Sequence, residues 1–168
     1  MNLVFPGVPA TLPLSLVNLI GLQVLKITGD SNIPGGAIEN NSVLSLPSLQ
    51  SIFLQSTALI GPLPDNIFAT SSNLTSLTFV RNSQLGQSLP SSLFNLPLQS
   101  LIVSFQSLNS PLNSFSNSTS LSQSLHTLDL SSNSITGPVP SFSSFTSLTE
   151  LRLDGNQLTS LPSSFLLP

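Results

Sequence analysis

The feature that most constrains the fold of this chain is a six-residue apolar pattern, L-x-x-L-x-L, which occurs six times in series. Its first position falls at residues 22, 49, 74, 98, 125 and 148, so the successive periods are 27, 25, 24, 27 and 23 residues. Self-similarity at a period of about 20 to 50 residues is typical of solenoids, in which each unit buries its apolar face against the next. We therefore predict one repeat domain over residues 1–168, with a partial repeat at 1–21.

The second half of each pattern alternates apolar and other residues, as a half-buried β-strand does. One such strand buries too little to be stable alone, so a stack of six parallel strands is expected. Three residues beyond each pattern stands a side chain that can form hydrogen bonds: Asp30, Thr57, Asn82, Gln106, Asn133 or Asn156. We expect these side chains to bond the backbone of adjacent coils where the chain leaves the strand.

The segments between the patterns are rich in proline, glycine and serine, and residues 61–64 (GPLP) match residues 137–140 (GPVP). Proline lacks an N–H and disfavours helix at the residue before it. Short 3₁₀ turns and extended pieces are therefore expected in these return segments, rather than long α-helices. The Ser- and Asn-rich stretch 109–124 is predicted to be a mobile loop.

The stretch LDLSSNSITGPVP, residues 128–140, resembles the consensus of plant-type leucine-rich repeats, L-x-L-x-x-N-x-L-x-G-x-I-P. The resemblance covers the chain from about Leu12 to Pro168. The resembling family includes receptor-like proteins, receptor-like kinase ectodomains and polygalacturonase-inhibitor-like proteins. It implies a right-handed superhelix with a parallel sheet on its concave face, a second short strand at the G-x-[LV]-P segments, and an extracellular or cell-surface location. The unit from Leu98 departs from it, with Ser110 for glycine and Asn113 for proline. The cysteine-bearing caps of the family are absent, which predicts a fragment of a larger protein.

The composition narrows the classes of partner. Charged residues make up 5% of the chain and the net charge is −3, against about 25% charged residues in an ordinary domain. Nucleic acid and anionic membranes require clustered basic residues, so neither is an expected partner. The chain has no Cys, and we predict neither a metal site nor a cofactor. It shows no signal peptide and no apolar run of the roughly 20 residues that a membrane span needs.

Catalytic patterns are also missing, so we predict that the chain is not an enzyme; a kinase domain elsewhere in a longer protein stays open. His126 is the only histidine, and there is no G-x-S-x-G motif around a serine nucleophile. Asp129, three residues after His126, is expected on the opposite face of the strand. Its predicted role is a cross-strand ion pair with Arg152, which occupies the equivalent place in the next unit.

The outward side chains of the predicted sheet form the candidate recognition face. Its central column is Lys26, Phe53, Thr78, Ile102, Asp129 and Arg152. From this column and the flanking one, the predicted ligand-binding residues are Lys26, Phe53, Gln55, Thr78, Val80, Ile102, Ser104, Asp129, Arg152 and Asp154. Phe53, Val80 and Ile102 are apolar on consecutive strands, which favours a contact patch. In the resembling family this face carries ligand recognition, so we expect a protein, peptide or cell-wall glycan ligand.

Three N-x-S/T sequons, at Asn40, Asn73 and Asn117, map to segments outside the sheet face. They are candidate glycosylation sites if the chain is secreted. The alternative function is a structural solenoid, either wall-associated or ice-binding, which the Ser/Thr-rich and charge-poor surface motivates. Ice binding favours a regular threonine ladder, and the central column instead mixes Lys, Phe, Asp and Arg.

Overall fold

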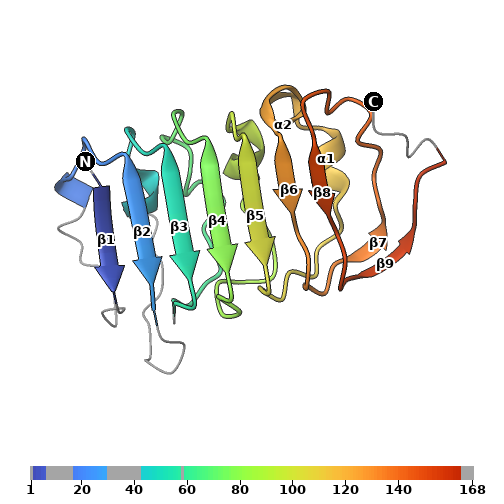
Figure 1. Cartoon of the computed structure of the whole chain (residues 1–168), viewed down its shortest axis with the longest axis horizontal. Coiled ribbons are helices and arrows are strands. Elements are labelled where there is room, and N and C mark those ends of the chain that lie inside the picture. Colours follow the sequence, from blue (N-terminus) through green and yellow to red (C-terminus); the bar gives the residue numbers. More distant parts are fainter. Residues whose placement is uncertain (1, 7–16, 30–42, 58, 164–168) are drawn as a thin grey trace.

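The computed structural model describes residues 2–6, 17–29, 43–57 and 59–163. Its main element is a seven-stranded parallel sheet in the order β1-β2-β3-β4-β5-β6-β8, in which chain order is also spatial order (Figure 1). The strands are β1 (Asn2–Pro6), β2 (Val24–Thr28), β3 (Ser51–Gln55), β4 (Ser76–Val80), β5 (Ser100–Ser104), β6 (Thr127–Asp129) and β8 (Glu150–Arg152). The predicted repeat solenoid is thereby confirmed.

Strand β1 is one more than the six strands expected, because residues 1–21 were predicted to be only the tail of a repeat. It pairs with β2 so that Leu3 lies beside Leu25 and Phe5 beside Ile27. Leu3 and Phe5 therefore hold the last two apolar positions of the repeat pattern. The six-residue pattern could not be matched there, because its first position would precede Met1.

The register between strands follows the repeat without a shift from β2 to β8. Lys26 lies beside Phe53, Phe53 beside Thr78, and Thr78 beside Ile102. Beneath them, the apolar residues of the pattern point inward and are buried, as in the alternation of β3 and β4, except that Leu151 and Leu153 of the last coil are only partly buried. The leucines of one coil thus stack on those of the next, and this stacking supplies the burial that no single strand could.

The return segments carry short helices on the far side of the sheet (Figure 1). They are the 3₁₀ turns η2 (Val43–Ser45) and η3 (Ser91–Asn95), and the α-helices α1 (Asn113–Ser116) and α2 (Thr119–Ser124). A second, two-stranded sheet pairs β7 (Thr136–Pro138) with β9 (Gln157–Ser160). Of the second strands expected at the G-x-[LV]-P segments, one is present as β7, which includes Gly137 and Pro138, whereas residues 61–64 form no strand.

The prediction of a mobile loop over residues 109–124 is wrong, because this stretch holds both α1 and α2. Phe115 and Leu121 are fully buried and anchor the two helices to the core. Ser118 caps α2 by accepting a hydrogen bond from the backbone of Leu121, and its hydroxyl donates to the carbonyl of Phe94 in the preceding coil. Serine and asparagine dominate the composition of the stretch, yet the few apolar residues are placed where they reach the core.

The predicted polar ladder forms at the exits of the strands. Asn133 Oδ1 accepts from the backbone N–H groups of Gln106 and Leu108, while its Nδ2 donates to the carbonyl of Val103 at 2.7 Å. Asn82 and Asn156 bridge their own coils to the preceding ones in the same way. Gln106 departs from the pattern: it is 2% exposed, and its Nε2 has no hydrogen-bond partner. Asp30 lies outside the described residues.

Candidate recognition face

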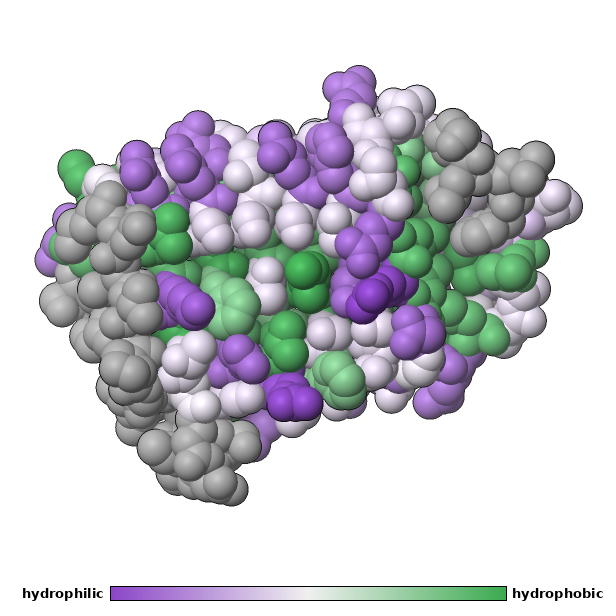
Figure 2. All heavy atoms as spheres, in the orientation of Figure 1, coloured by the Kyte–Doolittle hydropathy of each residue, from purple (hydrophilic) through white to green (hydrophobic). Residues whose placement is uncertain are grey.

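The sheet face opposite the helices presents the predicted columns side by side. Figure 2 looks onto this face and shows apolar surface in its middle, with polar surface above and strongly hydrophilic side chains on either side. Adjacent positions of a column are about 4.8 Å apart because neighbouring strands are hydrogen-bonded at that spacing. The structure therefore brings the residues of the central column together as expected.

The middle of the face is apolar and half-buried. Phe53, Val80 and Ile102 stand on consecutive strands, and each keeps part of its side chain exposed. The Lys26 ammonium lies 4.8 Å from the centroid of the Phe53 ring, which is within range of a cation–π contact. Gln55 and Thr78 are also half-buried and supply polar groups between the apolar ones. Ser104 was expected to be an outward, ligand-binding residue, but its short side chain lies beside the larger Val80 and is buried.

The end of the face near β8 is charged, but its pairing differs from the prediction. Arg152 Nε lies 3.1 Å from Glu150 Oε1 on the same strand, and this is the one salt bridge among the described residues. The predicted Asp129–Arg152 pair does not form, because Asp129 Oδ1 accepts a hydrogen bond from the N–H of Ser131 at 2.9 Å. An aspartate carboxylate can readily accept a hydrogen bond from the backbone N–H two residues ahead, and this local bond competes with an ion pair to the next strand. Asp154 is exposed beside this group.

A row of left-handed residues forms the edge where the chain leaves the strands. Ser56, Arg81, Phe105 and Ser132 have φ values of 51°, 56°, 56° and 54°, and Gly155 continues the row at 68°. Each stands two residues after the last apolar position of its repeat pattern. A bulky residue is a rare occupant of this conformation, so Phe105 is unusual there.

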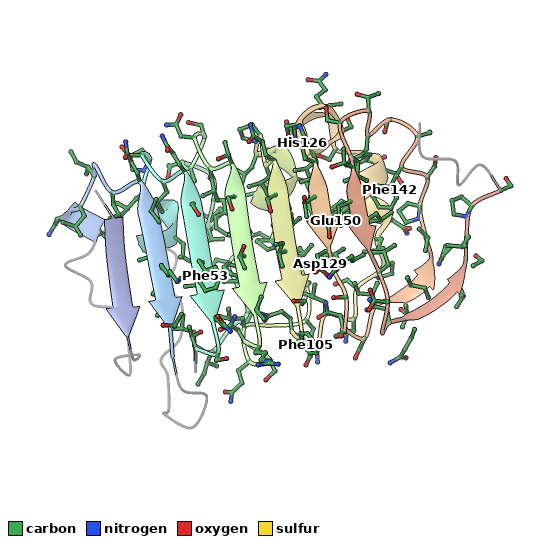
Figure 3. All side chains as sticks on the ribbon, viewed as in Figure 1. Phe53, Phe105, His126, Asp129, Phe142 and Glu150 are labelled. Carbon is green, nitrogen blue, oxygen red and sulfur yellow. The ribbon has the colours of Figure 1, made fainter. Side chains whose placement is uncertain are left out.

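Phe105 is the residue of this region that the sequence analysis missed. Half of its side chain is exposed, and the Arg81 guanidinium lies 5.5 Å from the centroid of its ring. Figure 3 shows Phe105 at the strand-exit edge of the sheet, just beyond the C-terminal end of β5. The signal in the sequence is its place in the repeat, where the other coils carry serine, arginine or glycine.

The remaining candidate groups stay apart from this face or from each other. His126 is exposed, and its Nδ1 lies 2.8 Å from the carbonyl oxygen of Ser124. Within the described ranges, no three His, Asp or Glu side chains are grouped so that they could hold a metal ion. None of the helices in the described part of the chain has the length and apolar character that crossing a bilayer requires.

Two of the three sequons can be placed. Asn73 precedes β4, and its Nδ2 donates to the carbonyl of Pro47 in the preceding coil. Asn117 is exposed at the C-terminal end of α1, on the helical side of the solenoid. Asn40 lies outside the described residues.

Comparisons with known proteins agree with this geometry. A family model described as "Leucine Rich repeats (2 copies)" matches residues 123–166. This match, and the plant receptor structures described below, agree with the plant-type leucine-rich repeat that residues 128–140 resemble. The repeat pattern, the asparagine ladder and the parallel sheet of this chain are consistent with that match. A comparison with curated protein sequences finds no match.

Solved leucine-rich repeat structures resemble most of this chain. The crystal structure of a TDR receptor is 31% identical with a TM-score of 0.72, and the match covers 88% of this chain and 25% of that one. The ectodomain of the Arabidopsis receptor kinase HAESA, solved with a peptide hormone ligand, is 26% identical with a TM-score of 0.68, over 88% of this chain and 24% of that one. A leucine-rich repeat protein of Leptospira interrogans is 25% identical with a TM-score of 0.72, over 92% and 36%. This chain therefore spans about a quarter of the length of the two receptors.

Proposed function

We propose that this leucine-rich repeat solenoid is a non-catalytic recognition module that binds an extended peptide segment of a protein ligand across its sheet face. The observation that carries the proposal is a cluster of half-exposed apolar side chains on three consecutive strands. Phe53 and Ile102 stand in the central column on either side of Thr78, and Val80 stands two residues beyond Thr78 on β4. Side chains on strands that are hydrogen-bonded on both sides are held rigidly, so little ordering is needed when a ligand binds.

The dimensions of the face set the length of ligand that it can hold. The central column has six positions from Lys26 to Arg152. At about 4.8 Å per strand it spans roughly 24 Å. An extended chain rises about 3.3 Å per residue, so a segment of about seven residues covers the column. The apolar patch contacts the middle of such a segment.

The charges on the face specify the ends of the ligand. Asp129, Glu150 and Asp154 gather near β8, and the charge of Arg152 is already partly compensated by Glu150. This end is therefore acidic and favours a Lys or Arg side chain. Lys26 at the other end lies over Phe53 and favours an acidic group or an aromatic ring. The expected ligand has an apolar centre and a basic residue toward β8.

The HAESA ectodomain supports this choice of ligand, since it was solved with a peptide hormone. On the same reasoning we propose that the chain is part of a receptor-like or secreted protein at the cell surface. Glycans on Asn73 and Asn117 would leave the sheet face free, because neither residue lies on it. The alternative of an ice-binding solenoid has less support, because the central column alternates charged, aromatic and aliphatic residues instead of repeating threonine.

The test uses an array of labelled eight-residue peptides, followed by titration of the selected peptides against the purified chain. The double variant Phe53→Ser/Ile102→Ser removes most of the patch, and we expect it to weaken binding at least tenfold. The matched control is Ile20→Ser/Ile60→Ser, which removes two exposed apolar side chains away from the sheet face and should bind like wild type. Circular dichroism checks that both variants fold.

Two results contradict the proposal. The first is equal binding of the selected peptides by wild type and by Phe53→Ser/Ile102→Ser. The second is that the chain binds none of the peptides but binds oligosaccharides on a parallel glycan array. Binding of the selected peptides should also weaken partly in high salt, because salt screens the exposed acidic residues near β8.

A further inference from the structure

A second feature lies on the helical side of the solenoid, away from the recognition face. It is an apolar cavity of about 180 Å³ between the coils that begin at Leu74, Leu98 and Leu125. Its lining residues come from all three coils: Ser88, Leu89, Phe94, Leu108, Ser110, Pro111, Leu112, Ser114, Phe115, Leu130 and Ile135. The neighbouring gap near Gly86, which is lined by the coils that begin at Leu49, Leu74 and Leu98, is only about 10 Å³.

The difference between these gaps follows from one repeat position, four residues after the polar ladder. Glycine holds this position at 61, 86 and 137, and Ser110 replaces it in the coil from Leu98. A Cβ atom on Gly61 would lie 2.2 Å from the carbonyl oxygen of Leu85, and one on Gly86 would lie 3.0 Å from Pro62 Cα. The coils before Ser110 therefore approach more closely than any side chain at this position permits.

Beyond Ser110 the coils stand further apart. A Cβ atom on Gly137 would meet nothing closer than the Cβ of Pro111, at 3.9 Å. The Ser110 hydroxyl donates to the carbonyl of Gln87 at 3.0 Å, so its side chain occupies the space between its coil and the preceding one. The cavity opens beside this contact, and we attribute it to Ser110 acting as a spacer where the repeat calls for glycine.

The walls of the cavity specify what it could hold. Leu108, Leu112, Phe115, Leu130 and Ile135 are buried and form its floor, whereas Ser88, Pro111 and Ser114 are exposed at its mouth. The Phe94 and Phe115 rings meet edge to face with their centroids 5.1 Å apart, and the centroid of the Phe142 ring lies 6.2 Å from that of Phe115, so a further ring beside them would extend an existing aromatic cluster. The hydroxyls of Ser88 and Ser114 have no partner among the described residues, which leaves them able to bond a polar group at the mouth.

We propose that this cavity binds a small aromatic molecule of one ring or a fused pair, with any hydroxyl or amine directed toward Ser88 and Ser114. An apolar cavity of about 150 Å³ in another protein is large enough for benzene, and this one is slightly larger. The site is separate from the peptide-binding face, so neither proposal depends on the other.

The experiment titrates the whole chain with benzene, phenol and indole and follows the methyl resonances of leucine and isoleucine by NMR. We expect saturable shifts at Leu112 and Ile135, which line the cavity. Leu89→Trp places a large ring in the wall and should weaken binding at least tenfold. The chain has no Trp of its own, so blue-shifted emission of this single indole reports that it fills the cavity.

A second pair of variants tests the cause of the gap. Ser110→Ala keeps the Cβ spacer but loses the hydrogen bond to Gln87, and it should bind phenol like wild type. Ser110→Gly lets the coils approach and should bind at least fivefold more weakly. Equal affinity of these two variants would overturn the role assigned to Ser110.

Two outcomes would overturn the site itself. One is the absence of saturable shifts with all three probes. The other is shifts confined to Leu151, Leu153 and Leu158, which line a separate open groove at the last coil, together with unchanged affinity in Leu89→Trp.

Discussion

The unpaired amide of Gln106 leads to a prediction about stability that is opposite to the usual effect of a core substitution. Gln106 is 2% exposed and its Nε2 has no hydrogen-bond partner. Leaving a buried donor unsatisfied costs about 1–3 kcal/mol. The same rung in the next coil is satisfied, since Asn133 Nδ2 donates to the carbonyls of Val103 and Leu130 at 2.7 and 3.0 Å. The difference between the rungs is one methylene, which places the glutamine amide beyond these partners.

Gln106→Asn should therefore raise the free energy of unfolding. Removing the unpaired donor stabilises the chain by about 1–3 kcal/mol. Losing one buried methylene destabilises it by about 0.8 kcal/mol. The expected net gain is about 1 kcal/mol, equivalent to a rise in Tm of roughly 2–4 °C for a chain of this size. Gln106→Met also removes the amide at nearly constant volume and should stabilise by a similar amount. The backbone N–H of Gln106 stays bonded to Asn133 Oδ1 in both variants.

The assay is urea unfolding followed by far-ultraviolet circular dichroism, because the chain has neither Trp nor Tyr to report by fluorescence. The matched control is Asn82→Met, which makes the same change at a rung whose amide donates to Leu54 and Val80. It should destabilise by about 2–3 kcal/mol, since it leaves carbonyls and the Thr57 N–H unpaired. A loss of stability in Gln106→Met as large as in Asn82→Met would refute the reasoning, because it would mean that the Gln106 amide is bonded after all.

Three further predictions concern single contacts. Asn133→Ala should cost about 3 kcal/mol or more in urea unfolding, because Asn133 serves two backbone N–H groups and three carbonyls; a cost below 1 kcal/mol would contradict its place in the ladder. Phe105→Gly should change stability by less than about 1 kcal/mol, since relief of the left-handed backbone offsets the lost contact with Arg81, whereas Phe115→Ala in the core should cost about 3–5 kcal/mol. Glu150→Gln should shift the free energy of unfolding by less than about 1 kcal/mol, because its ion pair with Arg152 is well exposed; a larger loss would indicate that the pair organises the end of the face.

The regular part of the structure follows from the sequence because the same constraint acts in every coil. Once the leucines stack, the outward residue between them has one possible neighbour on the next strand, so Phe53 must lie beside Thr78 and Ile102 beside Asp129. A shift of one residue would turn every buried side chain outward. The ladder follows for a similar reason, because buried turn groups need partners and asparagine is placed to supply them.

The irregular parts could not be predicted because each depends on local competition between small effects. Arg152 pairs with Glu150 and not Asp129 because Asp129 already bonds the Ser131 N–H. The helices α1 and α2 arise from a few apolar residues within a stretch whose composition indicates a loop. The cavity depends on Ser110, whose replacement of glycine is visible in the sequence but whose effect on the spacing of the coils is not.

The departures from regularity in the coil from Leu98 occur within six residues and affect both sides of the solenoid. Phe105 places a bulky side chain in a left-handed conformation at the edge of the recognition face, Gln106 leaves a buried amide unpaired, and Ser110 separates two coils on the helical side. The coil from Leu125 has Ser132, Asn133 and Gly137 at the same three positions, so the fold does not impose these costs. Positions that break local rules without a compensating gain in packing are expected where a protein binds something. These three positions are thus where stability has been given up on both sides of the solenoid, and we expect substitutions of Phe105 and Ser110 to alter binding more than folding.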